Sequence, residues 1–283
     1  MHIDSSEEVI TRGDITEKQT VKDWLSGLID VEKVKPFIME RLDLLNTRSN
    51  FVEDERQSIK YADRLFEYYS ANHPDKLFTE QERRIVRIGL IFSDIGKTGP
   101  LKADALQQDL VIRLFKVENV QDPKITIGKL IRDKFPDSAD EDINLLKDMG
   151  LSEEAPIERL WRLHSGWSKE IIENDGVPAD AIPAVALHHI LEGDNENLID
   201  EKGKFKDGFG GSNGSFDRAE KLVVILDKYD AFISRRGFAH EESLKRVLKI
   251  VNGNKRFEND PEFLELIQDL GVALTPEMEQ TNV

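Results

Sequence analysis

Cysteine is absent from the 283 residues of the chain. The chain can therefore form no disulfide bond, thiolate zinc site or iron–sulfur cluster, and it can use no cysteine nucleophile. Any metal ligands must be histidine, aspartate or glutamate side chains, a donor set that suits Fe, Mn, Mg or Zn.

Positive charge is also scarce, because 39 Lys and Arg residues stand against 55 Asp and Glu residues and give a net charge of −16. Affinity for nucleic acid comes largely from cationic side chains. The densest basic cluster, Lys202, Lys204 and Lys206, is short and flanked by acidic residues. We therefore expect no nucleic-acid partner and no binding to an anionic membrane surface.

Long apolar runs are missing too. No stretch approaches the roughly 18 consecutive apolar residues of a membrane helix. The first residues have neither the basic start nor the apolar run of a secretory signal. These features predict a soluble cytoplasmic protein.

Helical hydrophobic periodicity, by contrast, runs through almost the whole chain and predicts an all-α fold. Thr79 and Glu82 form the pattern of a capping box at one helix start. The expected helices cover residues 16–29, 34–45, 51–69, 80–93, 102–115, 127–135, 140–148, 155–173, 178–191, 216–234, 241–251 and 261–270. The glycine-rich segment 193–215 is predicted to be a long mobile loop, and residues 275–283 a frayed end.

The six histidines divide into two groups. We interpret His2, His73 and His240 as solvated residues of a terminus, a turn and a linker. The other three, His164, His188 and His189, lie within apolar helices. A buried imidazole needs hydrogen-bond partners or a metal, and a single one is more often a satisfied core residue.

Two carboxylates shift this balance toward a metal. Asp94 and Asp227 each follow at least four mostly apolar helical residues. Burying an unpaired carboxylate is costly, and a shared cation would neutralise several such groups at once. Three imidazoles and two carboxylates in these settings favour a shared cation over separately satisfied core residues.

Four segments resemble one known family. Phe92-Ser-Asp94-Ile-Gly-Lys97 is similar to the His-Asp-Ile-Gly-Lys motif of the HD-domain metal phosphohydrolases. In the right order, the segments around His164, around His188-His189 and from Leu226 to Arg236 resemble the HD-GYP branch, whose members hydrolyse cyclic dinucleotides. The resemblance implies an HD-domain helical bundle over residues 51–251, with an N-terminal helical extension (1–50) and a C-terminal helix and tail (252–283).

The sequence also departs from this family. Gln57 and Ser93 stand where the family has its first two histidine ligands, which both serve the first of two ions. The family's Gly-Tyr-Pro segment, which helps bind cyclic di-GMP, is absent, and the 193–215 loop takes its place. The resemblance therefore does not extend to cyclic di-GMP hydrolysis. Glu53 could add an oxygen ligand, although a solvated helix residue is the simpler interpretation.

The remaining matches imply a half-site for one divalent ion, with Fe, Mn or Zn suited to imidazole and carboxylate ligands, or a site that holds no ion. By resemblance its ligands are Asp94, His164 and His188, with His189 as a further candidate, and Asp227 lies on the side of the first ion. Lys97, three residues after Asp94, could neutralise a phosphoryl oxygen, or be a solvated helix-end lysine. Arg236 could clamp a phosphate, or be an ordinary surface arginine.

Two functions remain open at this stage. One is a metal-dependent phosphohydrolase or phosphodiesterase that acts on a small phosphorylated or nucleotide ligand through a metal-bound water, with Asp94 and Lys97 as catalytic residues. The other is a catalytically inactive, degenerate HD-GYP-like module in signalling, which binds a ligand, a protein partner or a second copy of itself. A mixed-valent oxygenase is disfavoured because it needs two irons.

Overall fold

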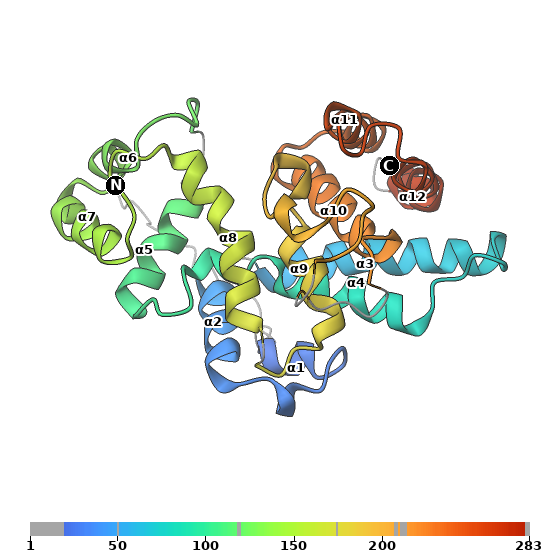
Figure 1. The fold of residues 1–283 in the computed structure, drawn as a ribbon, viewed down its shortest axis with the longest axis horizontal. Coiled ribbons are helices and arrows are strands. Elements are labelled where there is room, and N and C mark those ends of the chain that lie inside the picture. The colour runs from blue at the N-terminus through green and yellow to red at the C-terminus, as the bar shows by residue number, and fades with distance from the viewer. Residues whose placement is uncertain are drawn as a thin grey trace, which may run out of the picture.

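A computed structural model describes residues 20–49, 51–117, 120–173, 175–206, 209 and 214–280, and these form the all-α fold that the periodicity predicts. Within this part of the chain the only β-type pairings are three isolated bridges. The α-helices are α1 (Val21–Leu25), α2 (Pro36–Arg48), α3 (Phe51–Asn72), α4 (Glu80–Ser93), α5 (Ala105–Phe115), α6 (Ile127–Lys134), α7 (Ala139–Asp148), α8 (Ile157–Ile172), α9 (Ile182–Leu187), α10 (Arg218–Asp230), α11 (His240–Gly253) and α12 (Pro261–Gln280). Figure 1 shows their arrangement.

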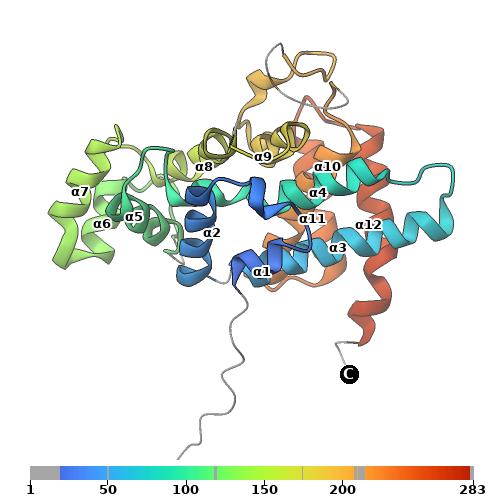
Figure 2. The same ribbon diagram turned by 90° about the horizontal axis from the view of Figure 1, so that it is seen from below.

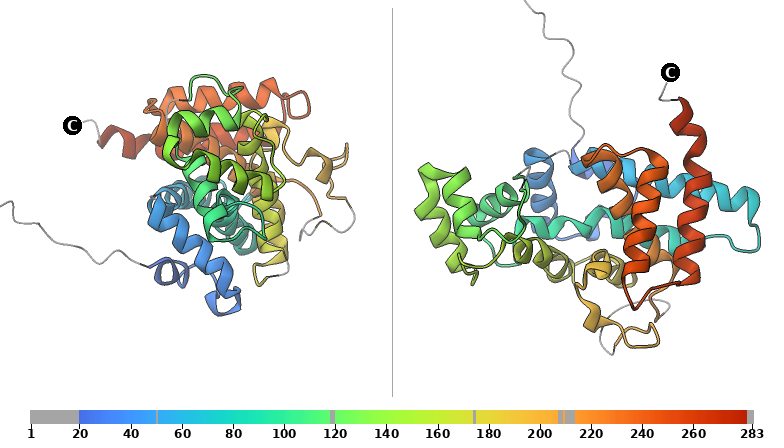
Figure 3. Two further views of the ribbon diagram at one scale, coloured as in Figure 1. Left: turned by 90° about the vertical axis from the view of Figure 1, so that its left-hand side faces the viewer. Right: turned by 90° about the horizontal axis from the view of Figure 1, so that it is seen from above.

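The helices enclose two hydrophobic clusters rather than one. The larger cluster is built mainly from α3, α4, α9, α10 and α12, and the smaller one from α5, α6, α7 and the first turns of α8. Figures 1 and 3 show α5–α7 at one end of the molecule and α11 and α12, which lie side by side, toward the other. Helix α8 connects the two clusters, because Leu160 packs in the smaller cluster and Ile171 in the larger one.

Helix α4 shows how local signals set the boundaries of an element. Thr79 accepts a hydrogen bond from the Glu82 backbone N–H at 3.2 Å, and the Glu82 carboxylate accepts one from the Thr79 N–H at 2.7 Å. Both bonds of the predicted capping box are therefore present. The helix ends at Ser93, directly before Asp94 and the 3₁₀ turn η2 (Ile95–Thr98).

The N-terminal helices α1 and α2 pack beside α3 and η2 (Figure 2). Arg41 of α2 is buried and donates hydrogen bonds to the Thr98 hydroxyl at 2.8 Å and to the Pro100 and Leu101 carbonyls at 2.9 Å each. It also donates to the carbonyls of Thr98 and Gly99 at 3.3 and 3.2 Å. The extension thus holds the turn that follows Lys97.

The single helix predicted over residues 178–191 is wrong. The chain instead forms a 3₁₀ turn, η4 (Ala179–Ala181), then α9, and then a second 3₁₀ turn, η5 (Ile190–Glu192). His188 Nδ1 donates to the Val185 carbonyl at 2.7 Å, so a side chain occupies a carbonyl that a continuing helix would use.

The last helix is also longer than predicted, because α12 continues beyond residue 270 to Gln280. His2, residues 16–19 of the first expected helix and residues 281–283 lie outside the described residues. In the 193–215 segment, Asn195 donates to the Ala186 carbonyl at 2.8 Å, and Arg256 donates to the Glu196 carbonyl at 3.2 Å. These bonds fasten its first turns to α9 and to the segment after α11.

None of the helices in the described ranges combines the length and the apolar character needed to cross a bilayer.

Candidate metal centre

The turn that carries Asp94 is fixed against α8. Gly96 donates its N–H to the Ser168 hydroxyl at 2.8 Å, and that hydroxyl donates to the Ser93 carbonyl at 2.6 Å. A Cβ at position 96 would lie 2.0 Å from the His164 carbonyl oxygen, so only glycine allows this approach. The packing brings Asp94 to His164, 70 positions further along the chain.

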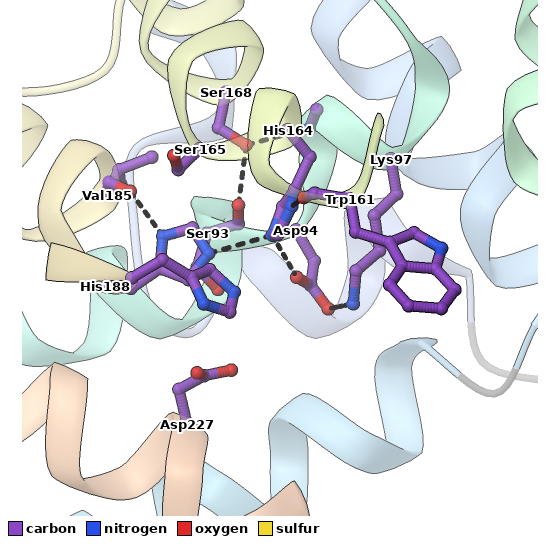
Figure 4. Close-up of polar contacts among 12 residues, drawn as sticks. Ser93, Asp94, Lys97, Trp161, His164, Ser165, Ser168, Val185, His188 and Asp227 are labelled. Carbon is purple, nitrogen blue, oxygen red and sulfur yellow. Dashed lines mark hydrogen bonds and ion pairs between the residues drawn. The ribbon is translucent and has the colours of Figure 1, made fainter. Parts of the chain in front are cut away.

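The three predicted histidines lie together. His164 comes from α8, and His188 and His189 follow the last turn of α9; one ligand atom of each lies within 4.8 Å of the others. The Nε2 atoms of His164 and His188 are 2.9 Å apart, and His164 Nε2 is 3.5 Å from Asp94 Oδ1 (Figure 4). His188 is fully buried, and His164 is nearly so.

The hydrogen bonds of these rings determine where their protons lie. His164 Nδ1 is 2.5 Å from the Trp161 carbonyl, and His188 Nδ1 is 2.7 Å from the Val185 carbonyl. A carbonyl oxygen only accepts, so each Nδ1 carries the proton and each neutral ring has its lone pair on Nε2. With both rings in this form, two lone pairs face each other at 2.9 Å, an arrangement that a positive centre beside them would stabilise.

That centre can be a proton or a metal ion. Burial, and next the neighbouring His164, lower the pKa of His188 to about 4, so this imidazole is neutral near pH 7. Neutral imidazole nitrogens with a carboxylate are ligands of Fe, Mn and Zn. The donor set of His164, His188 and Asp94 therefore fits the metal that the sequence predicts.

His189 and Asp227 have a different environment, because both contact the Lys228 ammonium. Lys228 is buried, and its Nζ lies 2.7 Å from His189 Nδ1, 2.8 Å from Asp227 Oδ2 and 2.7 Å from Glu192 Oε1. Burial would raise the pKa of Asp227, but the Lys228 charge, followed by His189 and His188, holds it far below the usual range. Asp227 is thus a carboxylate that faces the histidines from α10 (Figure 4).

The two predicted phosphate-binding residues have different surroundings. Lys97 forms an ion pair with Asp94, and its side chain keeps 18% of its surface exposed. Arg236 is exposed, and its guanidinium lies 5.4 Å from the centre of the Phe232 ring. The role of Arg236 as a phosphate clamp stays a prediction.

The structure also shows the environment of Ser93 and Gln57, which replace family histidines, and of the candidate ligand Glu53. The Ser93 hydroxyl donates to the Leu90 carbonyl at 2.9 Å, within its own helix. Glu53 is largely exposed and pairs with Arg56 at 3.3 Å, which agrees with the simpler interpretation of this residue as solvated. Gln57 is half-buried on α3.

Sequence reasoning missed Glu55, whose carboxyl group is buried on α3 near the candidate centre. Its pKa is raised well above the ordinary value, first by burial and next by the charge of Asp94, with Asp230 and Asp227 adding to the effect and Lys97 opposing it. The signal was present in the sequence, because Glu55 lies at helical spacing between the buried residues Val52 and Ile59.

Two histidines outside the site are less exposed than predicted. His240 is half-buried, with Nδ1 2.7 Å from the Tyr229 hydroxyl and Nε2 3.1 Å from the Gly271 carbonyl. His73 is also half-buried, and its ring centre lies 5.2 Å from that of Tyr69. Both contribute to packing at helix ends.

Comparison with known proteins adds no family to this description. No family model matches the chain, and no curated protein and no solved structure matches it. Membership of the HD-domain superfamily stays a prediction that rests on the four motifs.

Proposed function

We propose that this protein is an HD-GYP-like metal protein that hydrolyses a phosphate ester or diester bond in a small phosphorylated or nucleotide ligand. One divalent ion, Fe, Mn or Zn, would be held by His164, His188 and Asp94. The observation that carries the proposal is the pair of Nε2 atoms 2.9 Å apart, each with its Nδ1 committed to a backbone carbonyl. A bound divalent ion supplies Lewis-acid charge that makes water a nucleophile near neutral pH.

The chain's own residues have distinct tasks in this scheme. The Trp161 and Val185 carbonyls orient the two rings and fix their tautomers. Asp94 is held against His164 by the packing of η2 on α8. Lys97 pairs with Asp94 yet remains partly exposed, so its ammonium can turn to a phosphoryl oxygen that gains charge.

Metal analysis tests the proposal directly. Protein stripped with a chelator and reloaded separately with Mn, Fe or Zn should hold one ion per chain, and His188→Ala should lose it. His73→Asn alters a histidine outside the site and should retain the ion. Samples that stay empty both as purified and after reloading would contradict the proposal.

Hydrolysis is tested separately with bis(p-nitrophenyl) phosphate and a panel of nucleotides. Asp94→Asn should lower turnover at least 100-fold while the circular dichroism spectrum stays unchanged. Turnover that survives this substitution would show that hydrolysis does not depend on Asp94.

A second function, a catalytically inactive module that binds a ligand, a protein partner or a second copy, is favoured by one observation. Both site aspartates already contact an internal ammonium, Asp94 that of Lys97 and Asp227 that of Lys228. Such a module would show no turnover with any metal. It would instead be stabilised against heat by a nucleotide or a partner that it binds.

A further inference from the structure

Lys228 lies at a point where three acceptor groups converge from two segments of the chain. His189 and Glu192 belong to the turn after α9, and Asp227 belongs to α10. The ammonium has three protons, and the three short contacts of 2.7, 2.8 and 2.7 Å match them one for one. Each proton of the Lys228 ammonium therefore has an acceptor, and the amine has no lone pair available to act as a base.

The three acceptors are also a set of metal ligands. An imidazole nitrogen and two carboxylates bind Zn, Mn, Fe or Co at about 2.0–2.2 Å. Each contact to Lys228 Nζ would have to shorten by roughly 0.6 Å to reach that range. The Glu192 side chain is one-third exposed on a 3₁₀ turn, so it has room to move.

The charges of these side chains also suit a divalent metal ion. Asp227 and Glu192 carry two negative charges, and Lys228 neutralises one of them. Without the lysine, a divalent ion would neutralise both. The histidine that Lys228 contacts accepts through Nδ1, the atom whose lone pair a metal would use.

We infer that the Lys228 ammonium is the resident cation of a second cation position, formed by His189, Asp227 and Glu192, and that it limits the protein to at most one metal ion per chain. Removing the ammonium converts this position into a divalent-metal site. The inference concerns a position other than the His164–His188 centre, and it holds whether or not that centre binds an ion.

Cobalt(II) is a suitable probe, because its bound equivalents can be counted by elemental analysis and its visible absorption reports nitrogen and oxygen ligands. Wild-type protein should bind no more than one equivalent. Lys228→Ala should bind one equivalent more than wild type. In a His188→Ala background, Lys228→Ala should still gain one equivalent, which separates this position from the first.

Lys221 provides a matched control on the same helix. It is similarly buried and lies 2.9 Å from both Asp260 and Glu262, but it contacts no imidazole. Lys221→Ala should therefore bind no additional cobalt whose visible spectrum indicates a nitrogen ligand. A gain equal to that of Lys228→Ala would overturn the inference.

Two further results would overturn it. One is two cobalt equivalents in the wild-type protein, and the other is a folded Lys228→Ala protein that binds no more than wild type. Should Lys228→Ala lose its helical circular dichroism, added cobalt is expected to restore it, since the ion replaces the missing charge. Failure to restore it would count against the inference.

Discussion

Arg41 offers the sharpest test of how the fold supports the candidate centre. Replacing it with methionine keeps much of the apolar stem and removes five hydrogen bonds to the turn after Lys97. Burial lowers the pKa of Arg41 to about 10, so the guanidinium is still charged at pH 7. The wild-type interaction is therefore that of a buried cation with neutral acceptors.

The magnitude follows from which acceptors lose their donor. Three of the bonds, to the carbonyl and hydroxyl of Thr98 and to the Gly99 carbonyl, are buried, whereas those to Pro100 and Leu101 are part-buried and can be replaced by water. A buried acceptor left unpaired costs about 1–3 kcal/mol. Relief of the buried charge offsets part of this sum. We expect Arg41→Met to lower the free energy of unfolding by about 3 kcal/mol.

Urea unfolding followed by circular dichroism measures this change. With a slope of about 3 kcal/mol per molar urea, the midpoint should fall by about 1 M. Arg48→Met is the matched control, because Arg48 ends the same helix but is half exposed in its pair with Asp109, and it should cost less than about 1 kcal/mol. Equal losses in the two variants would refute the reasoning.

Two further predictions concern stability. Gly96→Ala should cost about 3 kcal/mol or prevent folding, because its Cβ would meet the His164 carbonyl, whereas Gly166→Ala on α8 meets nothing within 4 Å and should gain up to about 1 kcal/mol; similar melting temperatures would contradict this. Burial, and next Asp217, raise the pKa of Glu220 to about 9. The folded state therefore holds a proton that the unfolded state releases, so wild-type stability should fall as pH rises from about 5 to 9, by at most about 1.4 kcal/mol per unit. Glu220→Gln should make stability depend less on pH over this range. Melting temperatures measured from pH 5 to 9 that fall equally in both proteins would refute the assignment.

The parts of the fold that sequence reasoning predicted are those set by local signals. Helix α4 begins at its capping box and ends where its apolar run ends, so its bounds agree with the prediction. The segment around His188 was missed because a side chain takes a backbone carbonyl, which periodicity cannot reveal. The two hydrophobic clusters were missed because α8 contributes to both, and its pattern is the same as that of a helix in one core.

In the candidate site, too, some features follow from local sequence signals and others only from packing between distant segments. The burial of His164 and His188 was predictable, because an imidazole in an apolar helix needs a partner, whereas their meeting with His189 was implied by the family resemblance. Glu55 and Lys228 were missed because charged residues are expected at surfaces, and only packing shows which of them are buried. Apart from Asp227, which adjoins Lys228, their neighbours come from distant segments, and the chain order does not specify these pairings.

The smaller cluster has a consequence for how the centre assembles. Helices α5, α6 and α7 lie in sequence between Asp94 and His164. Gly96 donates to the Ser168 hydroxyl, which donates to the Ser93 carbonyl, and these bonds close loops across 72 and 75 positions. Closing a loop of that length has a large entropic cost, which decreases when the intervening chain is already compact. Packed together in the smaller cluster, the three helices shorten the effective loop that these bonds close. Leu114 and Ile131 lie in this cluster and are not candidate ligands. We therefore expect a cavity-forming substitution at either position to slow folding of the segment that brings Asp94 to His164.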